Sequence, residues 1–459
     1  MTTRVSQLAL RRRELFAALA AIGSSLYAAP KVGMRVLSTR PEDFEMPFDG
    51  FSTWITPVEK FFVRTHHFTP EVNMDTWKLT VDGKVARPLS LAMEDLKKLP
   101  RVELVSVLEC AGNGRGLYEP SMPGMQWKYG AVGNGRWAGV RLADVLKQAG
   151  VQESAVEVLF DGADVAVGTQ PEFQRSVPLQ KALDRNTLLA YEMNGAPLDR
   201  SHGFPLRLVV PGWAGDSWVK WLTRIEVRDT EFDGFFMKTA YRHPGKGVPP
   251  GTPVDPAKMR PVTHLSIKSL ITSHTSGSDT GMGPVTLRGA AWSNESPVTS
   301  VVVSTDSGRT WKPAALSSEK APFGWRLWEF QWMPPQEAYY TVMARAQNAA
   351  GQTQPLMQEW NPSGYGHNVV HAVGLNVTSK PRTEQAAAAA PHGDEVPAEV
   401  KQSCLACHTG EPLAQQRLTR AQWESEIQKM ERWGAKVKPE NRSAILDFLA
   451  DRYGTKPRR

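Results

Sequence analysis

The sequence is poor in cysteine, since its 459 residues contain only Cys110, Cys404 and Cys407. A domain stabilised by a set of disulfides is therefore excluded. The chain also lacks a basic patch with interleaved aromatic residues. Its net charge of +7 includes four arginines and one glutamate within residues 1–29, so the remainder is only weakly basic. We therefore expect no binding to nucleic acid.

Long apolar runs are absent as well, and the longest candidate belongs to an export signal. Arg11-Arg12-Arg13 is followed by Leu15-Phe16 and by an apolar stretch over residues 17–26, which ends near Ala28-Ala29. Paired arginines before Leu-Phe are typical of the twin-arginine route, which exports folded proteins. The stretch is too short to span a membrane comfortably. We predict a signal over residues 1–29 and a periplasmic protein without a membrane segment; a cytosolic amphipathic helix or simple anchor is the alternative.

The sequence predicts three units after this signal. Residues 35–245 form an α+β domain, with strands at Val102–Leu108, 155–160 and 206–210 and short helices at Leu142–Ala149 and Leu179–Ala182. Residues 261–376 contain short, regularly spaced β-rich runs, which predict an immunoglobulin-like β-sandwich without a disulfide. These runs are residues 265–271, 285–291, 298–304, 325–332 and 339–348.

The C-terminal part divides into a linker and a helical unit. Residues 377–398 include the alanine run 386–390 and are expected to form a flexible tether. Residues 399–459 contain a CxxCH motif among helical patterns and are predicted to form a small all-α cytochrome c domain. Thr419 is an N-cap candidate with Gln422 at N3, and residues 439–453 form the terminal helix.

The motif Cys404-Leu405-Ala406-Cys407-His408 predicts covalent attachment of a c-type haem. Two thioether bonds hold the porphyrin while the following histidine ligates iron. Met430 is the only methionine after His408, on the helix face of Trp423 and Ile427. We therefore predict His408 and Met430 as axial ligands. The alternatives are a zinc or redox dithiol for the cysteines and core packing for Met430.

Cys110 remains without a cysteine partner. It ends a predicted strand and opens the glycine-rich loop Ala111-Gly112-Asn113-Gly114-Arg115. Small neighbours let a bulky group approach the sulfur, and the charge of Arg115 favours the thiolate. A buried, inert thiol is the alternative.

This loop resembles the Cys-Ala-Gly-Asn segment of the sulfite oxidase family of molybdenum enzymes. Other motifs follow in family order over residues 40–376, so the resemblance covers most of the chain. These motifs are residues 61–66 (FFVRTH), 136–142 (RWAGVRL), 191–195 (YEMNG), 202–207 (HGFPLR), 219–222 (VKWL) and 289–293 (GAAWS).

The resemblance implies a molybdopterin cofactor with Cys110 as the protein ligand of molybdenum. Tyr241 matches the active-site tyrosine beside the metal, and Arg64 and Arg115 would face an anionic substrate. The residues implied to hold molybdopterin are Arg64, His66, Asp164, His202, Arg207 and Lys220. Structural roles for His202 and Arg207, and a turn position for Asp164, are the alternatives.

Three positions depart from the animal members of the family. Gly114 precedes a single arginine where they have two, and Thr65 replaces their asparagine. Trp360-Asn361 is followed by Pro362-Ser363, so a further pocket arginine is missing. These losses make the anion pocket less positive.

The resemblance implies a sulfite dehydrogenase that passes electrons through its haem to a soluble cytochrome c, as a homodimer or with another cytochrome subunit. The molybdenum subunit of a sulfane dehydrogenase in thiosulfate oxidation is the alternative. An electron-transfer or binding protein without molybdenum and, more remotely, a nitrate reductase stay open.

Covalent haem is the first expectation that an experiment can check. Replacing Cys404 and Cys407 together by alanine removes both thioether sulfurs, so haem staining of the denatured chain should be lost. Cys110→Ser is the matched control and should keep the stain. Absence of the stain from the denatured wild-type chain would contradict the haem assignment.

Overall fold

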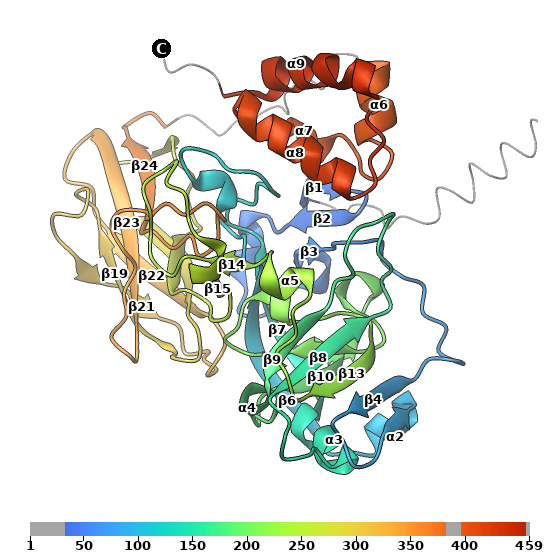
Figure 1. Ribbon diagram of the computed structural model, residues 1–459. Helices are drawn as coiled ribbons and strands as arrows, with labels where there is room; N and C mark the ends of the chain where they lie inside the picture. The colour runs from blue at the N-terminus through green and yellow to red at the C-terminus, as the bar shows by residue number, and fades with distance from the viewer. Residues whose placement is uncertain (1–32, 382–395, 456–459) are drawn as a thin grey trace, which may run out of the picture.

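The computed structural model describes residues 33–381 and 396–455. It contains a mixed α/β unit, a β-sandwich and a group of C-terminal helices (Figure 1). The predicted signal over residues 1–29 and residues 382–395 of the predicted linker lie outside the described residues. Within the described ranges, no helix is long and apolar enough to cross a membrane.

The first unit is built on three sheets. The three-stranded sheet has the order β1 (Arg35–Thr39), β2 (Glu42–Glu45), β3 (Val63–Arg64). One five-stranded sheet contains β11 (Ala196–Pro197), β10 (Leu188–Met193), β7 (Val132–Arg141) and β6 (Arg101–Glu109), with β12 (Arg207–Val209) paired to β10. The other has the order β5 (Leu89–Leu91), β4 (Leu79–Gly83), β13 (Leu222–Arg228), β8 (Glu157–Gly162), β9 (Arg175–Pro178).

The short helices of this unit cover the sheets. They are α2 (Met93–Lys97), α3 (Leu142–Ala149), α4 (Leu179–Ala182) and α5 (Phe235–Lys238). The predicted bounds of α3 and α4 are confirmed, and α3 ends at Gly150, whose φ of 70° a glycine adopts without strain. The strand predicted over residues 155–160 begins two residues later, at Glu157. The apolar side chains of these elements form one buried core that reaches the sulfur of Cys110.

The second unit is a β-sandwich, entered through the short hairpin of β14 (Arg242–His243) and β15 (Arg260–Pro261). One sheet has the order β16 (Lys268–Ile271), β18 (Val285–Trp292), β22 (Arg326–Trp332), β21 (Ala315–Leu316). The other has the order β17 (Ser278–Thr280), β24 (His371–Val377), β23 (Ala338–Asn348), β19 (Val298–Ser304), β20 (Lys312–Pro313). Apolar side chains from both sheets form its core. The five predicted strands are confirmed with small shifts, whereas β17, β20, β21 and β24 were not predicted.

The C-terminal unit contains α6 (Ala398–Cys404), α7 (Glu411–Ala414), α8 (Arg420–Arg432) and α9 (Arg442–Tyr453). Thr419 caps α8 and forms the predicted capping box with Gln422. The single helix predicted over residues 439–453 is wrong at its start, because Pro439–Asn441 form a separate 3-10 turn. Trp423, Ile427 and Ile445 are buried in a core of its own.

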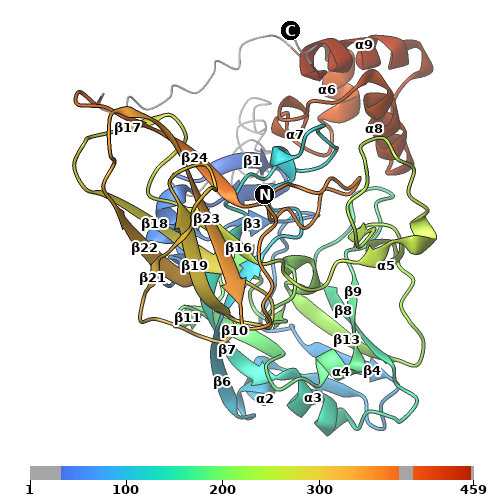
Figure 2. The same cartoon turned by 90° about the vertical axis from the view of Figure 1, so that its left-hand side faces the viewer.

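The C-terminal unit lies against the first unit beside β1 (Figures 1 and 2). The guanidinium of Arg40 donates to the carbonyls of Leu405 (2.9 Å) and Ala406 (3.2 Å), inside the CxxCH motif. Gln415 accepts a hydrogen bond from the Gln126 backbone (2.9 Å). Gln416 donates to the Gly124 carbonyl (2.9 Å). Polar side chains on one unit thus bind main-chain groups of the other, which fixes their mutual position.

A buried polar cluster joins the first unit to the sandwich. Glu109, the last residue of β6, accepts hydrogen bonds from Asn113 Nδ2 (2.8 Å), Trp292 Nε1 (2.8 Å) and the ammonium of Lys268. Glu109 and Lys268 are 3% and 7% exposed, so this charge pair is removed from water. Since Cys110 is the next residue, the Glu109 cluster also determines where its sulfur lies.

Lys268→Met leaves the Glu109 carboxylate buried without its cation. We expect the free energy of unfolding to fall by about 3–5 kcal/mol, because an uncompensated buried charge is costly. Urea denaturation followed by tryptophan fluorescence measures this loss. The double variant Glu109→Gln/Lys268→Met should recover part of it, and Lys312→Met, at an exposed site of the same unit, serves as control. Equal midpoints for Lys268→Met and Lys312→Met would refute the role of the pair.

Candidate functional site

Cys110 lies at the bottom of a cavity in the first unit. Its backbone N–H donates to the Ala131 carbonyl (2.9 Å), and its own carbonyl accepts from the Asn113 backbone (2.9 Å). The loop then turns at Gly114, whose φ is 95° and where a Cβ would lie 2.6 Å from His367. Only glycine fits at this position, because the loop backbone passes so close to His367.

The expectation that the charge of Arg115 favours the thiolate form of Cys110 does not hold for the protein without a metal. Burial raises the pKa of the thiol above its ordinary value, although the charges of Arg64 and Arg115 act in the opposite direction. The uncoordinated thiol is therefore protonated near neutral pH. A bound metal ion would reverse this, because coordination removes the thiol proton.

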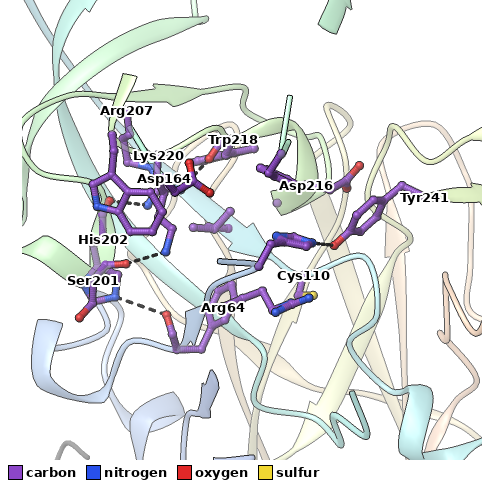
Figure 3. A pocket seen from close by; sticks show the side chains of 16 residues that line it. Arg64, Cys110, Asp164, Ser201, His202, Arg207, Asp216, Trp218, Lys220 and Tyr241 are labelled. Atoms are coloured by element: carbon purple, nitrogen blue, oxygen red, sulfur yellow. Dashed lines mark hydrogen bonds between the residues drawn. The ribbon is translucent and has the colours of Figure 1, made fainter. Parts of the chain in front are cut away.

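A deep cavity of about 60 Å³ collects most of the predicted cofactor residues (Figure 3). They come from loops and strand ends that are far apart in the sequence. The predicted residues that line it are Arg64, His66, Cys110, Asp164, His202, Arg207, Lys220 and Tyr241. Arg115 is not among them and lines the adjoining, larger cavity.

One end of the deep cavity carries two cations, the buried Arg207 and the half-buried Lys220. Arg207 donates to the carbonyls of His202 (2.9 Å) and Trp218 (3.2 Å), and Lys220 donates to that of Ser201 (2.9 Å). In the described part of the chain, neither cation forms a salt bridge. Burial lowers the pKa of Arg207 to about 9 and that of Lys220 to about 7, where the charge of Arg207 adds to the effect. An anion bound here would relieve both penalties.

Asp164 and His202 flank these cations. Burial raises the pKa of Asp164 to about 7, against the opposing effect of Lys220. Asp164 is 6% exposed and lines the cavity, so it is not a surface turn residue. His202 Nδ1 is 2.8 Å from the Asp199 carboxylate and Nε2 is 3.3 Å from the Phe62 carbonyl. These bonds fix the orientation of the His202 ring. They are equally compatible with a structural role and with a role in holding the cofactor.

The other end lies beside the sulfur and contains a polar pair. His66 Nε2 and the Tyr241 hydroxyl are 2.6 Å apart, and the His66 ring stacks on Phe173 at 4.0 Å. Burial lowers the pKa of His66 and raises that of Tyr241, so the imidazole is neutral and the phenol protonated. Arg64 nearby is paired with Asp43 (3.1 Å).

Residues that the sequence analysis did not predict complete the walls of the two cavities. Asp216 forms a buried ion pair with Arg175 (2.6 Å). Trp218 lines the deep cavity, and Tyr365 reaches the larger one from the sandwich. The tryptophan-rich run over residues 213–221 was a usable signal for Trp218. No local pattern indicated Tyr365, because the two side chains that contact its ring, Tyr241 and Arg115, are more than 100 residues away in the sequence.

The larger cavity, of about 550 Å³, extends from the first unit to the C-terminal helices. Cys110, Arg64 and Arg115 line it on one side. On the other side it is lined by Cys404, Cys407, His408, Met430 and Trp433. The CxxCH motif therefore opens into the same space as Cys110.

The fold and site define a molybdopterin oxidoreductase. Residues 66–236 match the oxidoreductase molybdopterin binding domain, and residues 259–378 match the Mo-co oxidoreductase dimerisation domain. Mitochondrial sulfite oxidase of Rattus norvegicus is 36% identical over 363 residues, which are 75% of this chain and 66% of the rat protein. Sulfite oxidase of Arabidopsis thaliana is 31% identical over 375 residues, 75% of this chain and 94% of the plant protein. The chain belongs to the sulfite oxidase family.

A solved structure with the same fold is the sulfane dehydrogenase SoxCD from Paracoccus pantotrophus. It has a TM-score of 0.65 and 27% identity and covers 78% of this chain and 92% of that chain. The chain spans just under two thirds of the rat sulfite oxidase. The two matched domains end at residue 378, before the CxxCH motif.

Because the pKa of Lys220 is low, anion binding by Arg207 and Lys220 should depend on pH. In cofactor-free protein, affinity for inorganic sulfate should fall on the order of tenfold between about pH 6.5 and 8.5, because Lys220 loses its charge above about pH 7 while sulfate remains a dianion. Calorimetry measures this. Lys220→Gln should bind weakly at both pH values, and the exposed Lys246→Gln should behave like wild type. A wild-type affinity that is constant over this range would exclude the assignment.

Proposed function

We propose that this chain is a periplasmic sulfite dehydrogenase, exported by the twin-arginine route. It oxidises sulfite to sulfate with a molybdenum–molybdopterin cofactor and passes electrons through its own c-type haem to a soluble cytochrome c. One observation carries this proposal: Cys110 and the CxxCH motif line the same cavity. Family membership supports the molybdenum chemistry, and the shared cavity supports the route for electrons.

The residues of the deep cavity fit a molybdopterin. In the described part of the chain, the buried Arg207 and the half-buried Lys220 form no salt bridge, and Arg207 Nε has no hydrogen-bond partner. A phosphate group satisfies such donors. Cys110, at the other end, would be the protein ligand of the metal. When bound, the metal centre supplies the oxygen transferred to sulfur and takes up two electrons.

The chain's own side chains prepare the site for an anion. Arg64 and Arg115 present positive charge to the cavity beside Cys110, which offsets the charge of sulfite as it binds. The neutral His66 holds the protonated Tyr241 hydroxyl at 2.6 Å, so this phenol lies in a fixed position beside the sulfur. His66 and Asp164 would contact the pterin edge, as the family resemblance implies.

The CxxCH loop fits a haem. His408 Nδ1 is 2.7 Å from the Thr409 carbonyl, so this nitrogen carries the proton and leaves Nε2 for the iron. Burial lowers the pKa of His408, which favours the neutral form that a ligand needs. Met430, half-buried across the same cavity, would be the second axial ligand. The haem would accept the electrons one at a time.

The position of the C-terminal unit favours transfer within one chain. Arg40 binds the carbonyls of Leu405 and Ala406 and so ties the CxxCH loop to the strand region of the first unit. Electrons would leave this loop toward a soluble cytochrome c. The match to a dimerisation domain supports a homodimer, and a complex with another cytochrome subunit is the alternative arrangement.

A sulfane dehydrogenase of thiosulfate oxidation is the second candidate. The structural similarity to SoxCD favours it, as does the segment Pro362-Ser363 after Trp360-Asn361, which lacks the pocket arginine that the family resemblance implies there. Against it, residues of the C-terminal helices line the larger cavity, so a sulfur group carried on another protein would have to pass them.

Reduction of the haem by sulfite tests the main proposal. We expect added sulfite to reduce the wild-type haem within the mixing time of a stopped-flow experiment and not to reduce Cys110→Ser, because the metal ligand is lost. Dithionite should reduce both, which shows that the variant retains its haem. Failure of sulfite to reduce the wild-type haem would overturn the proposal.

The substrate is tested separately with ferricytochrome c as acceptor. Free sulfite alone should support steady turnover by purified, molybdenum-loaded protein. Turnover that requires a sulfur-carrier protein would favour the sulfane dehydrogenase instead. Haem iron without any molybdenum in metal analysis would favour a protein that only transfers electrons.

A further inference from the structure

The aromatic ring of Tyr365, a residue of the sandwich, forms part of the wall of the larger cavity. The guanidinium of Arg115 lies over this ring, 4.9 Å from its centroid. The ring of Tyr241 stacks on it at 5.5 Å with an interplanar angle of 15°. Arg175 in turn lies 5.4 Å from the Tyr241 ring. Tyr365 is thus the link between an arginine and the phenol beside the sulfur.

The guanidinium of Arg115 occupies a slot that glycines make possible. A Cβ on Gly112 or Gly124 would lie 2.9 Å from its Nη1, and one on Gly364 would lie 2.9 Å from its Nε. Side chains at these positions would displace the group. We call these three glycines together with the Tyr365 ring the Arg115 slot.

Hydrogen bonds alone hold Arg115 weakly. Its Nη1 and Nη2 reach the carbonyls of Met125 (3.4 Å) and Ser363 (3.3 Å), both at the long limit. Its Nε is buried and has no hydrogen-bond partner in the described residues, nor does the side chain form a salt bridge there. The ring face of Tyr365 is therefore the main element that orients this cation.

The loop that carries Tyr365 is itself fixed. The Tyr118 hydroxyl and Asn361 Nδ2 both donate to the Tyr365 carbonyl, each at 2.9 Å. Gly364 and Gly366 on either side have φ values of 64° and 72°. The backbone therefore holds the ring in place before any ligand binds.

We propose that Tyr365 is a positioning residue, which holds the Arg115 guanidinium flat against its ring so that the remaining N–H groups face an anionic substrate beside Cys110. The proposal rests on the proposed function, since that function supplies the anion. It also gives the sandwich a part in substrate binding.

Two variants at this position separate the ring from the hydroxyl. Tyr365→Phe keeps the ring face and should leave the KM for sulfite within about twofold. Tyr365→Leu removes it and should raise KM about tenfold with little change in kcat, because a positioned binding group is lost from ground and transition state alike. Sulfate binding, measured by calorimetry without turnover, should weaken by a similar factor. The exposed Tyr339→Leu, on the same unit, is the control.

The outcomes are distinct. Equal effects of the Phe and Leu variants, an unchanged KM in Tyr365→Leu, or a fall in kcat alone would each overturn the proposal. If Tyr365→Leu does not fold or load molybdenum, Arg115→Lys replaces it: this variant keeps the charge but loses the planar group, and an unchanged KM and sulfate affinity would count against the slot. If the wild type does not oxidise sulfite, the proposed function fails, and the sulfate measurement still decides the role of Tyr365.

Discussion

Glu109 carries a charge that folding removes from water, and the rest of the site depends on how that charge is held. Three donors surround it, one from its own loop (Asn113) and two from the sandwich (Lys268 and Trp292). Breaking such a pair exposes a buried charge to an apolar surrounding, which is costly. The strand end that carries Cys110 is therefore fixed to the second unit, and the sulfur cannot move independently of the sandwich.

This attachment makes the site a property of both units. The first unit supplies the sulfur, the cations Arg207 and Lys220 and the His66–Tyr241 pair. The sandwich supplies the counter-charge that holds the loop and, through Tyr365, a ring beside Arg115. The matched family name assigns this unit to dimerisation, yet its side chains reach the cavity directly. Its packing therefore helps to determine the shape of the cavity.

The C-terminal helices add a third contribution. They contact the first unit through polar groups, with the Arg40 guanidinium and the amides of Gln415 and Gln416 paired to main-chain atoms or side-chain amides. Such hydrogen bonds are directional, so they fix the orientation of the helices on the first unit. The CxxCH loop thereby lines the larger cavity together with Cys110.

The sequence by itself determined the helices and strands that have a local apolar pattern. It also determined which side chains are available for chemistry. A β-rich apolar run predicted β6, apolar periodicity predicted α8, and α3 and α4 were also predicted. The order of the family motifs indicated Cys110 and the other predicted site residues that line the cavity. Only the tertiary structure decided what depends on distant neighbours. It showed that burial raises the pKa of Cys110 despite Arg115 and that the CxxCH loop shares a cavity with the sulfur. It also brought in Tyr365. Desolvation and contact are set by packing between segments hundreds of residues apart, which no local pattern records.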